Sequence, residues 1–346
     1  MPPSPIPFPM LPVETDPPLT RELRAIIAGD FTVRAARALE PQAREVAVEL
    51  IDEFIERGEC DIAAELATPL PARVILRMLD FDPGGWREWV DCVHVLMHER
   101  DIDPDRTLRA AGTLFAAIDV EVRRRERDGL GTDLLSKIMR GTAGGRALEP
   151  MEVAMYALVL FLAGMDTTSG LTGNALLQLD RQPALRERLI ADRGLLPAAV
   201  EEFLRHDTPA QGLARTVTRD TEFHGQRLRK GDPVLMMFAA ANRDPAVFDR
   251  PDEIDFDRDA GKHLAFGVGE HRCLGANLAR VLFRVMLDEV LTRLPDFRVT
   301  GPPVRFPDSG ETYALRHLPI AFTPGPRRTP RTAPGETTVT TPGRTS

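Results

Sequence analysis

Hydrophobic positions recur at helical spacing through much of the first half of the chain. In residues 42–57 apolar side chains fall three or four positions apart, and residues 74–79 and 108–122 repeat this spacing. Such spacing places apolar side chains on one face of a helix. The proline-rich residues 1–18 end in Asp-Pro-Pro, which suits a helix entrance because proline fixes φ and lacks an N–H donor. We therefore predict a helical array that begins near Leu19.

The segment of residues 150–179 is apolar nearly all the way round. A helix of this kind is buried, so we predict a central core helix there. Its longest apolar run, residues 154–163, is too short to cross a bilayer. Helical periodicity returns in residues 197–205 and 274–294.

Short strand-like runs alternate with turn residues in residues 216–237 and again in residues 297–322. Residues 324–346 contain almost nothing apolar to bury, so we expect a disordered tail there. The predicted fold class is mainly α with small β-sheets (α+β), with one domain over residues 19–323.

Composition narrows the class of protein. The 346 residues are 43% hydrophobic and 28% charged, as in ordinary soluble domains, and the formal net charge of -8 gives no basic field for nucleic acid. The N-terminus has neither a basic region nor a continuous apolar region, so we expect no signal peptide or membrane anchor. Cys60, Cys92 and Cys273 form no C-x-x-C unit for zinc and cannot all pair, which favours a reducing cytoplasm.

Cys273 lies in a glycine-rich loop, HLAFGVGEHRCLGANLAR, that leads into a predicted helix. Gly267 and Gly269 allow backbone conformations that a β-carbon would block. The helix opening at Leu274-Gly275 directs amide hydrogens toward the sulfur and favours the thiolate. A thiolate without a second cysteine nearby suits a metal bound from one side, and haem iron with an axial cysteine is the obvious candidate.

The run F-G-x-G-x-H-x-C-L-G, from Phe266 to Gly275, resembles the cysteine-ligand signature of the cytochrome P450 family. The similarity to the soluble bacterial branch extends from about residue 15 to residue 323. It implies the cytochrome P450 fold, haem b with Cys273 as the axial ligand, and O2 as co-substrate. It also implies monooxygenase activity, in which one oxygen atom enters an apolar small molecule by hydroxylation or epoxidation.

The predicted central helix contains Ala163-Gly164-Met165-Asp166-Thr167-Thr168, which resembles the family's oxygen-activating motif. Thr167 can bond back to the carbonyl of Ala163, and Gly164 leaves room above a flat ring. Asp166 in an apolar helix must be paired, protonated or exposed to a water path. Taken alone, the Asp-Thr-Thr-Ser run could equally cap a second helix. The resemblance assigns Asp166 and Thr167 to proton delivery.

Glu202 and Arg205 lie three residues apart on a predicted helix, a spacing that on its own is typical of a solvated surface pair. Here they resemble the family's E-x-x-R pair. The resemblance implies a buried structural lock that Arg258 completes.

Haem carries two propionates, which need cations near the ring edge. The resemblance gives this role to Arg24, Arg215 and His271, with Thr20 standing where many bacterial relatives have histidine. It also places several residues against the haem, namely Ala163, Gly164, Phe266, Gly267 and Gly275. The remaining histidines have no ligand-like spacing, and we predict surface or capping roles for them: His94, His98, His206, His224, His263 and His317. Trp86 and Trp89 are assigned to packing or pocket lining without preference.

Electrons must come from outside the chain. Gly141–Gly145 lacks the G-x-G-x-x-G spacing of a nucleotide loop, so we expect a separate ferredoxin or flavodoxin system that docks around Arg272 and Arg280. We expect a monomer. The substrate pocket is predicted to draw its walls from residues 159–164, 209–213, 309–315 and 93–114.

Two other functions remain open, a peroxygenase and a non-catalytic or vestigial haem-binding scaffold. The family's chains carry further helices and strands before the Asp-Pro-Pro helix, so either the start codon is set too late or the fold is truncated at its N-terminus. A truncated fold would leave sheet edges and apolar surface uncovered, and we expect the chain as written to bind haem poorly or to be insoluble.

Overall fold

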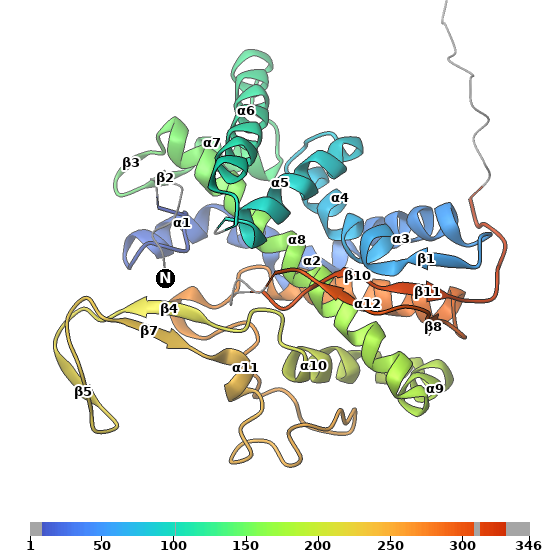
Figure 1. The fold of residues 1–346 in the computed structure, drawn as a ribbon. Helices are drawn as coiled ribbons and strands as arrows, with labels where there is room; N and C mark the ends of the chain where they lie inside the picture. Colours follow the sequence, from blue (N-terminus) through green and yellow to red (C-terminus); the bar gives the residue numbers. More distant parts are fainter. Residues whose placement is uncertain (1–8, 101, 308–311, 330–346) are drawn as a thin grey trace, which may run out of the picture.

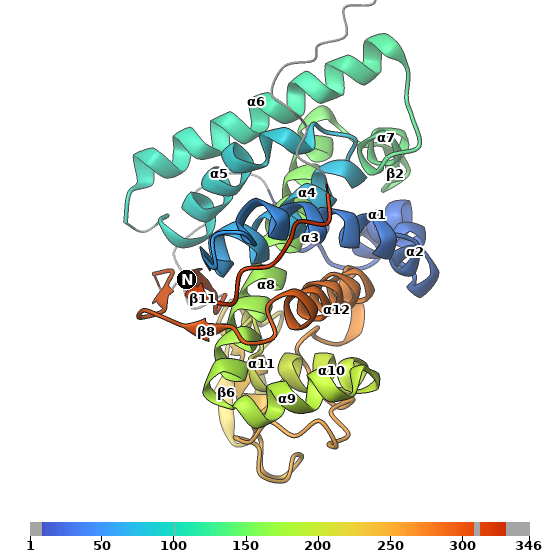
Figure 2. The same cartoon turned by 90° about the vertical axis from the view of Figure 1, so that its right-hand side faces the viewer.

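The computed structural model describes residues 9–100, 102–307 and 312–329, and helices dominate it (Figure 1). Helices of the first half occupy one end of the body and α9 and α10 the other, with α8 running between them (Figure 2). The helices are α1 (Leu19–Ile27), α2 (Val33–Ala38), α3 (Glu40–Phe54), α4 (Pro69–Met78), α5 (Trp86–His98), α6 (Pro104–Asp128), α7 (Leu134–Arg140), α8 (Pro150–Arg181), α9 (Pro183–Ala191), α10 (Leu196–His206), α11 (Phe238–Ala241) and α12 (Ala276–Arg293).

The predicted central helix is α8, which packs against α4, α6 and α12. It begins with a capping box in which Glu149 and Glu152 each accept from the other's backbone N–H. It is long and apolar enough to cross a membrane by length and composition alone. However, 72% of its apolar window is buried inside the protein, as in the core helix of a soluble protein.

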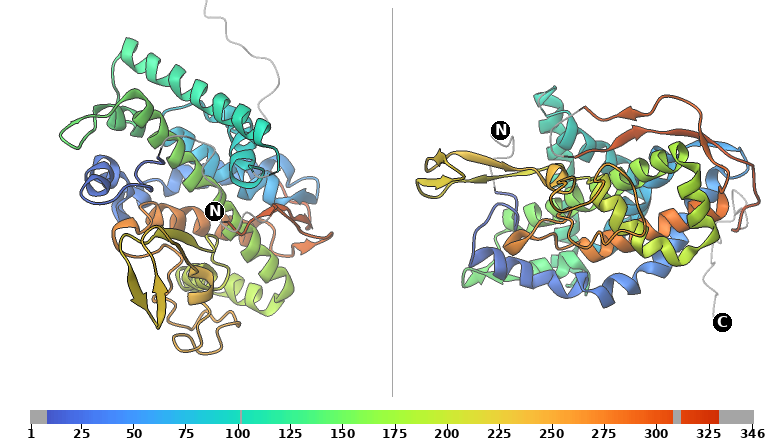
Figure 3. Two further views of the ribbon diagram at one scale, coloured as in Figure 1. Left: turned by 60° about the vertical axis from the view of Figure 1, so that its left-hand side comes forward. Right: turned by 90° about the horizontal axis from the view of Figure 1, so that it is seen from below.

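The strands form small antiparallel sheets, as predicted. β4 (Leu213–Thr216) pairs with β7 (Pro233–Met236), and β5 (Thr221–Phe223) pairs with β6 (Gln226–Leu228) in a hairpin that projects from the body (Figure 3). Near the C-terminus β9 (Val304–Arg305) pairs with β10 (Leu315–His317), and β11 (Pro319–Ala321) pairs with β8 (Arg298–Val299).

Several elements were not anticipated. They include β1 (Glu59–Asp61), which joins the edge of β11, and helix α9, and others such as α2, α7 and α11 were likewise not singled out by the sequence pattern. The glycine-rich Gly141–Gly145 segment contains strand β2 (Thr142–Ala143) and the Gly144-Gly145 turn that joins β2 to β3 (Arg146–Ala147) in a hairpin.

Part of the predicted disordered tail is ordered. Asp52 on α3 accepts from the backbone N–H groups of Arg328 and Thr329, and it also pairs with Arg293 of α12 at 2.7 Å. Burial on its own would raise the pKa of Asp52, but these bonds lower it to about 2. Residues 324–329 are therefore attached to the body, whereas residues 330–346 lie outside the described residues.

Candidate active site

The Cys273 loop has the tight backbone that its glycines predict. The Cys273 N–H donates to the Phe266 carbonyl at 2.8 Å, and the Gly267 N–H donates to the Leu264 carbonyl at 2.9 Å. Gly267 and Gly269 have φ of +63° and +71°, a region that disfavours residues with a β-carbon. α12 starts at Ala276 directly after the loop and packs against α8.

The Cys273 thiol is solvent-exposed, yet enough protein surrounds it that desolvation raises its pKa. The Gly275 N–H and the cations Arg24, Arg272 and Arg280 act in the opposite direction. Burial therefore works against the expected preference for thiolate, which the Gly275 N–H supports. A bound metal cation would supply it, because coordination deprotonates a thiol.

Several features fit a haem at this loop. In residues 9–100, 102–307 and 312–329, no group of three or more His, Cys, Asp or Glu side chains could hold a metal ion. Burial, followed by repulsion from Arg215 and Arg24, lowers the pKa of His271. Three basic groups thus converge beside the loop, an arrangement that suits the two propionates.

The arginines of this cluster have few acceptors of their own. Arg24 of α1 donates to the Arg272 carbonyl at 2.7 Å. Among contacts within the described residues, the Arg215 guanidinium donates to the carbonyl of adjacent Ala214. Both retain donors for an anionic ligand.

Thr20 does not match its predicted role. Its side chain is fully buried, and its hydroxyl is 2.9 Å from the Thr15 hydroxyl and also donates to the Thr15 carbonyl. The hydroxyl is therefore used within the turn that leads into α1 and is not offered to a propionate.

The oxygen-activating motif lies in one continuous helix. α8 runs unbroken from Pro150 to Arg181, so the alternative in which the Asp-Thr-Thr-Ser run caps a second helix is wrong. The Thr167 hydroxyl donates to the Ala163 carbonyl at 3.0 Å, as predicted. Ala163 is exposed and Thr167 is partly exposed, so these two residues line the open side of the helix.

Gly164 has a different purpose from the one predicted. A β-carbon there would lie 2.9 Å from Cδ1 of Ile75 on α4. The missing side chain allows close packing of α8 on α4 and does not open a gap above a ring.

Asp166 is paired, which is one of the three states expected for it. Its side chain is fully buried and its Oδ2 lies 2.6 Å from Nε2 of His98, which is also fully buried. His94 lies one turn earlier on α5, with its Nε2 3.6 Å from Oδ1 of Asp166. The predicted surface or capping role is therefore wrong for His98, and His94 is a largely covered neighbour of the same carboxylate.

The sequence reasoning missed this cluster, which Phe306 completes. The Phe306 ring stacks on His98 with centroids 4.2 Å apart and lies 4.4 Å from the His94 ring. The i, i+4 spacing of the two histidines, combined with the need of Asp166 for a partner, was the available signal.

Glu202, Arg205 and Arg258 lie together in the interior. Arg205 donates from Nε and Nη2 to the two Glu202 carboxylate oxygens, both at 2.8 Å, and Arg258 Nε approaches Glu202 at 3.2 Å. Both Glu202 and Arg205 are fully buried. Arg205 also donates to three carbonyls of the following loop, those of Asn242, Pro251 and Glu253.

Arg280 is not free for a docking partner. It donates to Glu201 at 2.6 and 2.8 Å and lies over the Phe266 ring with 4.5 Å to the centroid. Its charge is used to hold the Cys273 loop onto α10. Arg272 remains exposed.

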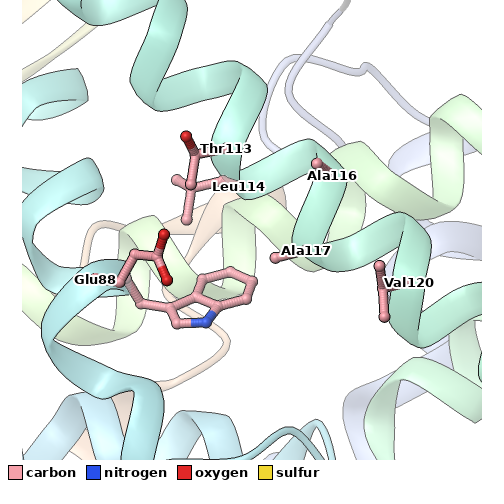
Figure 4. A pocket seen from close by; sticks show the side chains of 7 residues that line it. Glu88, Thr113, Leu114, Ala116, Ala117 and Val120 are labelled. Atoms are coloured by element: carbon pink, nitrogen blue, oxygen red, sulfur yellow. The ribbon is translucent and has the colours of Figure 1, made fainter.

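A pocket of about 380 Å³ lies between α5 and α6, lined by Glu88, Trp89, Thr113, Leu114, Ala116, Ala117 and Val120 (Figure 4). Trp89 also stacks on Phe161 of α8 with centroids 4.3 Å apart, so it both packs and lines a pocket. None of the lining residues belongs to the Cys273 loop or to the Ala163–Thr168 motif. The predicted wall of residues 309–315 lies partly outside the described residues.

Known proteins share both this sequence and this fold. The family model "Cytochrome P450" matches residues 97–321. The "Cyclomarin C epoxidase CymV" of Salinispora arenicola is 38% identical over 89% of this chain and 79% of its own length. A "Steroid C26-monooxygenase" of Mycobacterium tuberculosis is 34% identical over 92% of this chain and 87% of its own.

Solved structures agree with these relatives. A mutant of P450 EryK in complex with erythromycin B superposes with a TM-score of 0.85 at 32% identity, covering 93% of this chain and 85% of that one. CYP109E1 from Bacillus megaterium in complex with testosterone superposes with a TM-score of 0.84 at 29% identity, covering 89% of this chain and 82% of that one. The chain therefore belongs to the cytochrome P450 family of monooxygenases.

Proposed function

We propose that this protein is a haem-thiolate monooxygenase that inserts one oxygen atom of O2 into an apolar small molecule by hydroxylation or epoxidation. The observation that carries the proposal is Cys273, held at the start of α12 by a glycine loop beside three converging basic groups. Membership of the family implies haem iron and O2.

Each part of the site has a distinct task. Cys273 would ligate the iron of haem b, and Arg24, Arg215 and His271 would bind its propionates. The bound haem would supply the redox-active iron at which O2 is activated. Gly275 lies beside the sulfur and its N–H favours the anionic form, while the Phe266 carbonyl accepts from the Cys273 N–H.

Asp166 and Thr167 have the task of moving protons. The Thr167 hydroxyl donates to the Ala163 carbonyl, so its oxygen lone pairs remain free to accept a hydrogen bond from a donor on the open side of α8 and to hold that donor in place. Asp166 is the nearest titratable group along the helix. The acid–alcohol pair favours the use of O2 with external electrons over a peroxygenase.

Glu202, Arg205 and Arg258 have a structural task. They tie α10 to the loop of residues 242–258 that precedes the Cys273 loop. They support the fold that holds the cofactor and do not act on substrate.

The partners of the enzyme are part of the proposal. We assign electron supply to a ferredoxin or flavodoxin system in a reducing cytoplasm, with docking near the exposed Arg272. The named relatives include a steroid monooxygenase and a testosterone complex, which supports an apolar substrate.

A carbon monoxide difference spectrum tests the proposal. The haem-loaded, reduced protein should give the red-shifted Soret band of thiolate coordination, and Cys273→Ser should abolish it. Cys92→Ser is the matched control, since Cys92 is a half-buried cysteine on α5 away from the loop. A normal band in Cys273→Ser would overturn the proposal.

Thr167→Ala tests proton delivery. With surrogate ferredoxin and reductase, we expect this variant to consume O2 while releasing more hydrogen peroxide and less oxidised product. Unchanged coupling would remove Thr167 from the mechanism.

A further inference from the structure

The carboxylate of Asp166 points toward α5 and not toward the open side of α8. Its Oδ2 is 2.6 Å from Nε2 of His98, and both side chains are fully buried. Successive residues of an α-helix differ in direction by about 100°, so Asp166 and its neighbour Thr167 face different ways. To deliver a proton near Thr167, the carboxylate must leave His98.

The hydrogen bond between His98 and Asp166, which we call the clamp, is held rigidly. His98 is the last residue of α5, and its ring stacks on Phe306 at an interplanar angle of 10°. A short hydrogen bond between a carboxylate and an imidazole in a dry interior is strong, because no water competes for either partner. The strength of this clamp therefore sets how often Asp166 is released.

The second oxygen of Asp166 faces His94. Oδ1 of Asp166 and Nε2 of His94 are both buried without a hydrogen-bond partner within the described residues, and they lie 3.6 Å apart. A separation just beyond direct bonding is closed by a small movement or by one water. Leaving two such atoms permanently unpaired would cost free energy, so the pair is poised for contact.

His94 is the member of the cluster that reaches solvent. Its side chain is 18% exposed, against 0% for His98 and Asp166. The other charged groups that act on His94 are Asp91 and Arg316. Burial lowers the pKa of His94 to about 4, so a neutral ring is present near pH 7.

We propose that His98 is the positioning residue that holds Asp166 away from Thr167, and that His94 is the residue through which Asp166 exchanges protons with water. This inference rests on the proposed function. In each exchange the His94 Nε2–H proton passes to Oδ1 of Asp166, while Nδ1 of His94 takes a proton from a solvent hydronium ion, which leaves as water. The ring stays neutral, and the carboxylate becomes a carboxylic acid that can leave His98.

The clamp is tested by nuclear magnetic resonance of the haem-loaded protein in its diamagnetic ferrous carbon monoxide form. The short bond predicts a strongly downfield Nε2 proton resonance for His98. Asp166→Asn should remove this resonance. His317→Gln is the control, because His317 and Asp61 form a surface pair at the same distance of 2.6 Å.

Proton exchange between Asp166 and water through His94 is tested by the solvent isotope effect, that is, by the rate of reductase-driven O2 consumption in H2O relative to D2O, without added substrate. His94→Phe keeps the ring contact with Phe306 but removes both nitrogens. We expect it to increase the solvent isotope effect at least about twofold, whereas His317→Gln should leave it unchanged.

The double variant separates positioning from packing. Since His98 acts through Asp166, adding His98→Leu to Asp166→Asn should change peroxide yield no further, and His98→Gln, which keeps a donor, should stay closer to the parent than His98→Leu. Three results would each overturn the inference. They are additive changes in peroxide yield in the double variant, a solvent isotope effect that His94→Phe leaves unchanged, and a downfield resonance that survives Asp166→Asn. Loss of the thiolate Soret band in the parent protein would instead refute the proposed function and leave the resonance test standing.

Discussion

The buried Glu202 carboxylate gives the sharpest stability prediction. It accepts hydrogen bonds from Nε and Nη2 of Arg205, from the Asp255 N–H at 2.9 Å and from Arg258 Nε at 3.2 Å. Glu202→Gln keeps the shape but removes the only charge that neutralises the fully buried Arg205 within the described structure. An orphaned buried charge costs about 3–5 kcal/mol.

That cost is a large share of the total free energy of unfolding. A domain is typically stable by about 5–15 kcal/mol, so Glu202→Gln should shift urea unfolding, followed by circular dichroism at pH 7, to much lower denaturant. Arg205 also bonds three backbone carbonyls of the loop that precedes the Cys273 loop. We therefore expect the variant to lose haem faster as well.

The control is Glu253→Gln. Glu253 pairs with Arg250 at 2.8 Å with the same i, i+3 spacing, but both side chains are exposed. Exposed pairs contribute about 0–1 kcal/mol, so this change should be nearly silent. If both glutamine variants cost the same, burial is not the source of the stabilisation at Glu202.

Three further changes probe the packing and charge of the site. Gly267→Ala should cost about 1 kcal/mol and weaken haem retention because φ is +63°, whereas Gly29→Ala, where nothing lies within 4 Å, should not; equal haem loss rates would contradict this. Gly164→Ala should lower the melting temperature through a clash with Ile75, and adding Ile75→Val should recover part of the loss; no recovery would place the strain elsewhere. Burial alone would raise the pKa of Glu201, but its hydrogen bonds to Arg280 and His263 lower it to about 2, below its usual value near 4.5. Its stabilisation is present above about pH 4.5 and is lost as the pH falls toward 2, so Glu201→Gln should flatten the acid limb of a stability-against-pH curve.

Local patterns in the sequence predicted much of the fold and the cysteine loop. The apolar composition of residues 150–179 predicts a buried helix, and α8 is that helix. The glycines of the loop predicted backbone that only glycine adopts easily, and Gly267 and Gly269 have positive φ. Both features are determined by residues that are close together in the sequence.

The errors concern contacts between distant segments. Whether Gly164 opens a gap depends on Ile75, which approaches from α4. Whether His98 is a surface residue depends on α5 packing against α8. The i, i+4 spacing of His94 and His98 places them on one helix face but does not say which helix that face meets. The hydroxyl of Thr20 had several possible acceptors, and the turn at Thr15 brings one of them within reach.

The attachment of residues 324–329 to Asp52 has a practical consequence for protein engineering. Cutting the chain before Arg328 would remove two backbone donors from a buried carboxylate and leave it to Arg293 alone. Affinity tags or fused redox domains should therefore be joined after Thr329, where the junction leaves the hydrogen bonds from Arg328 and Thr329 to Asp52 intact.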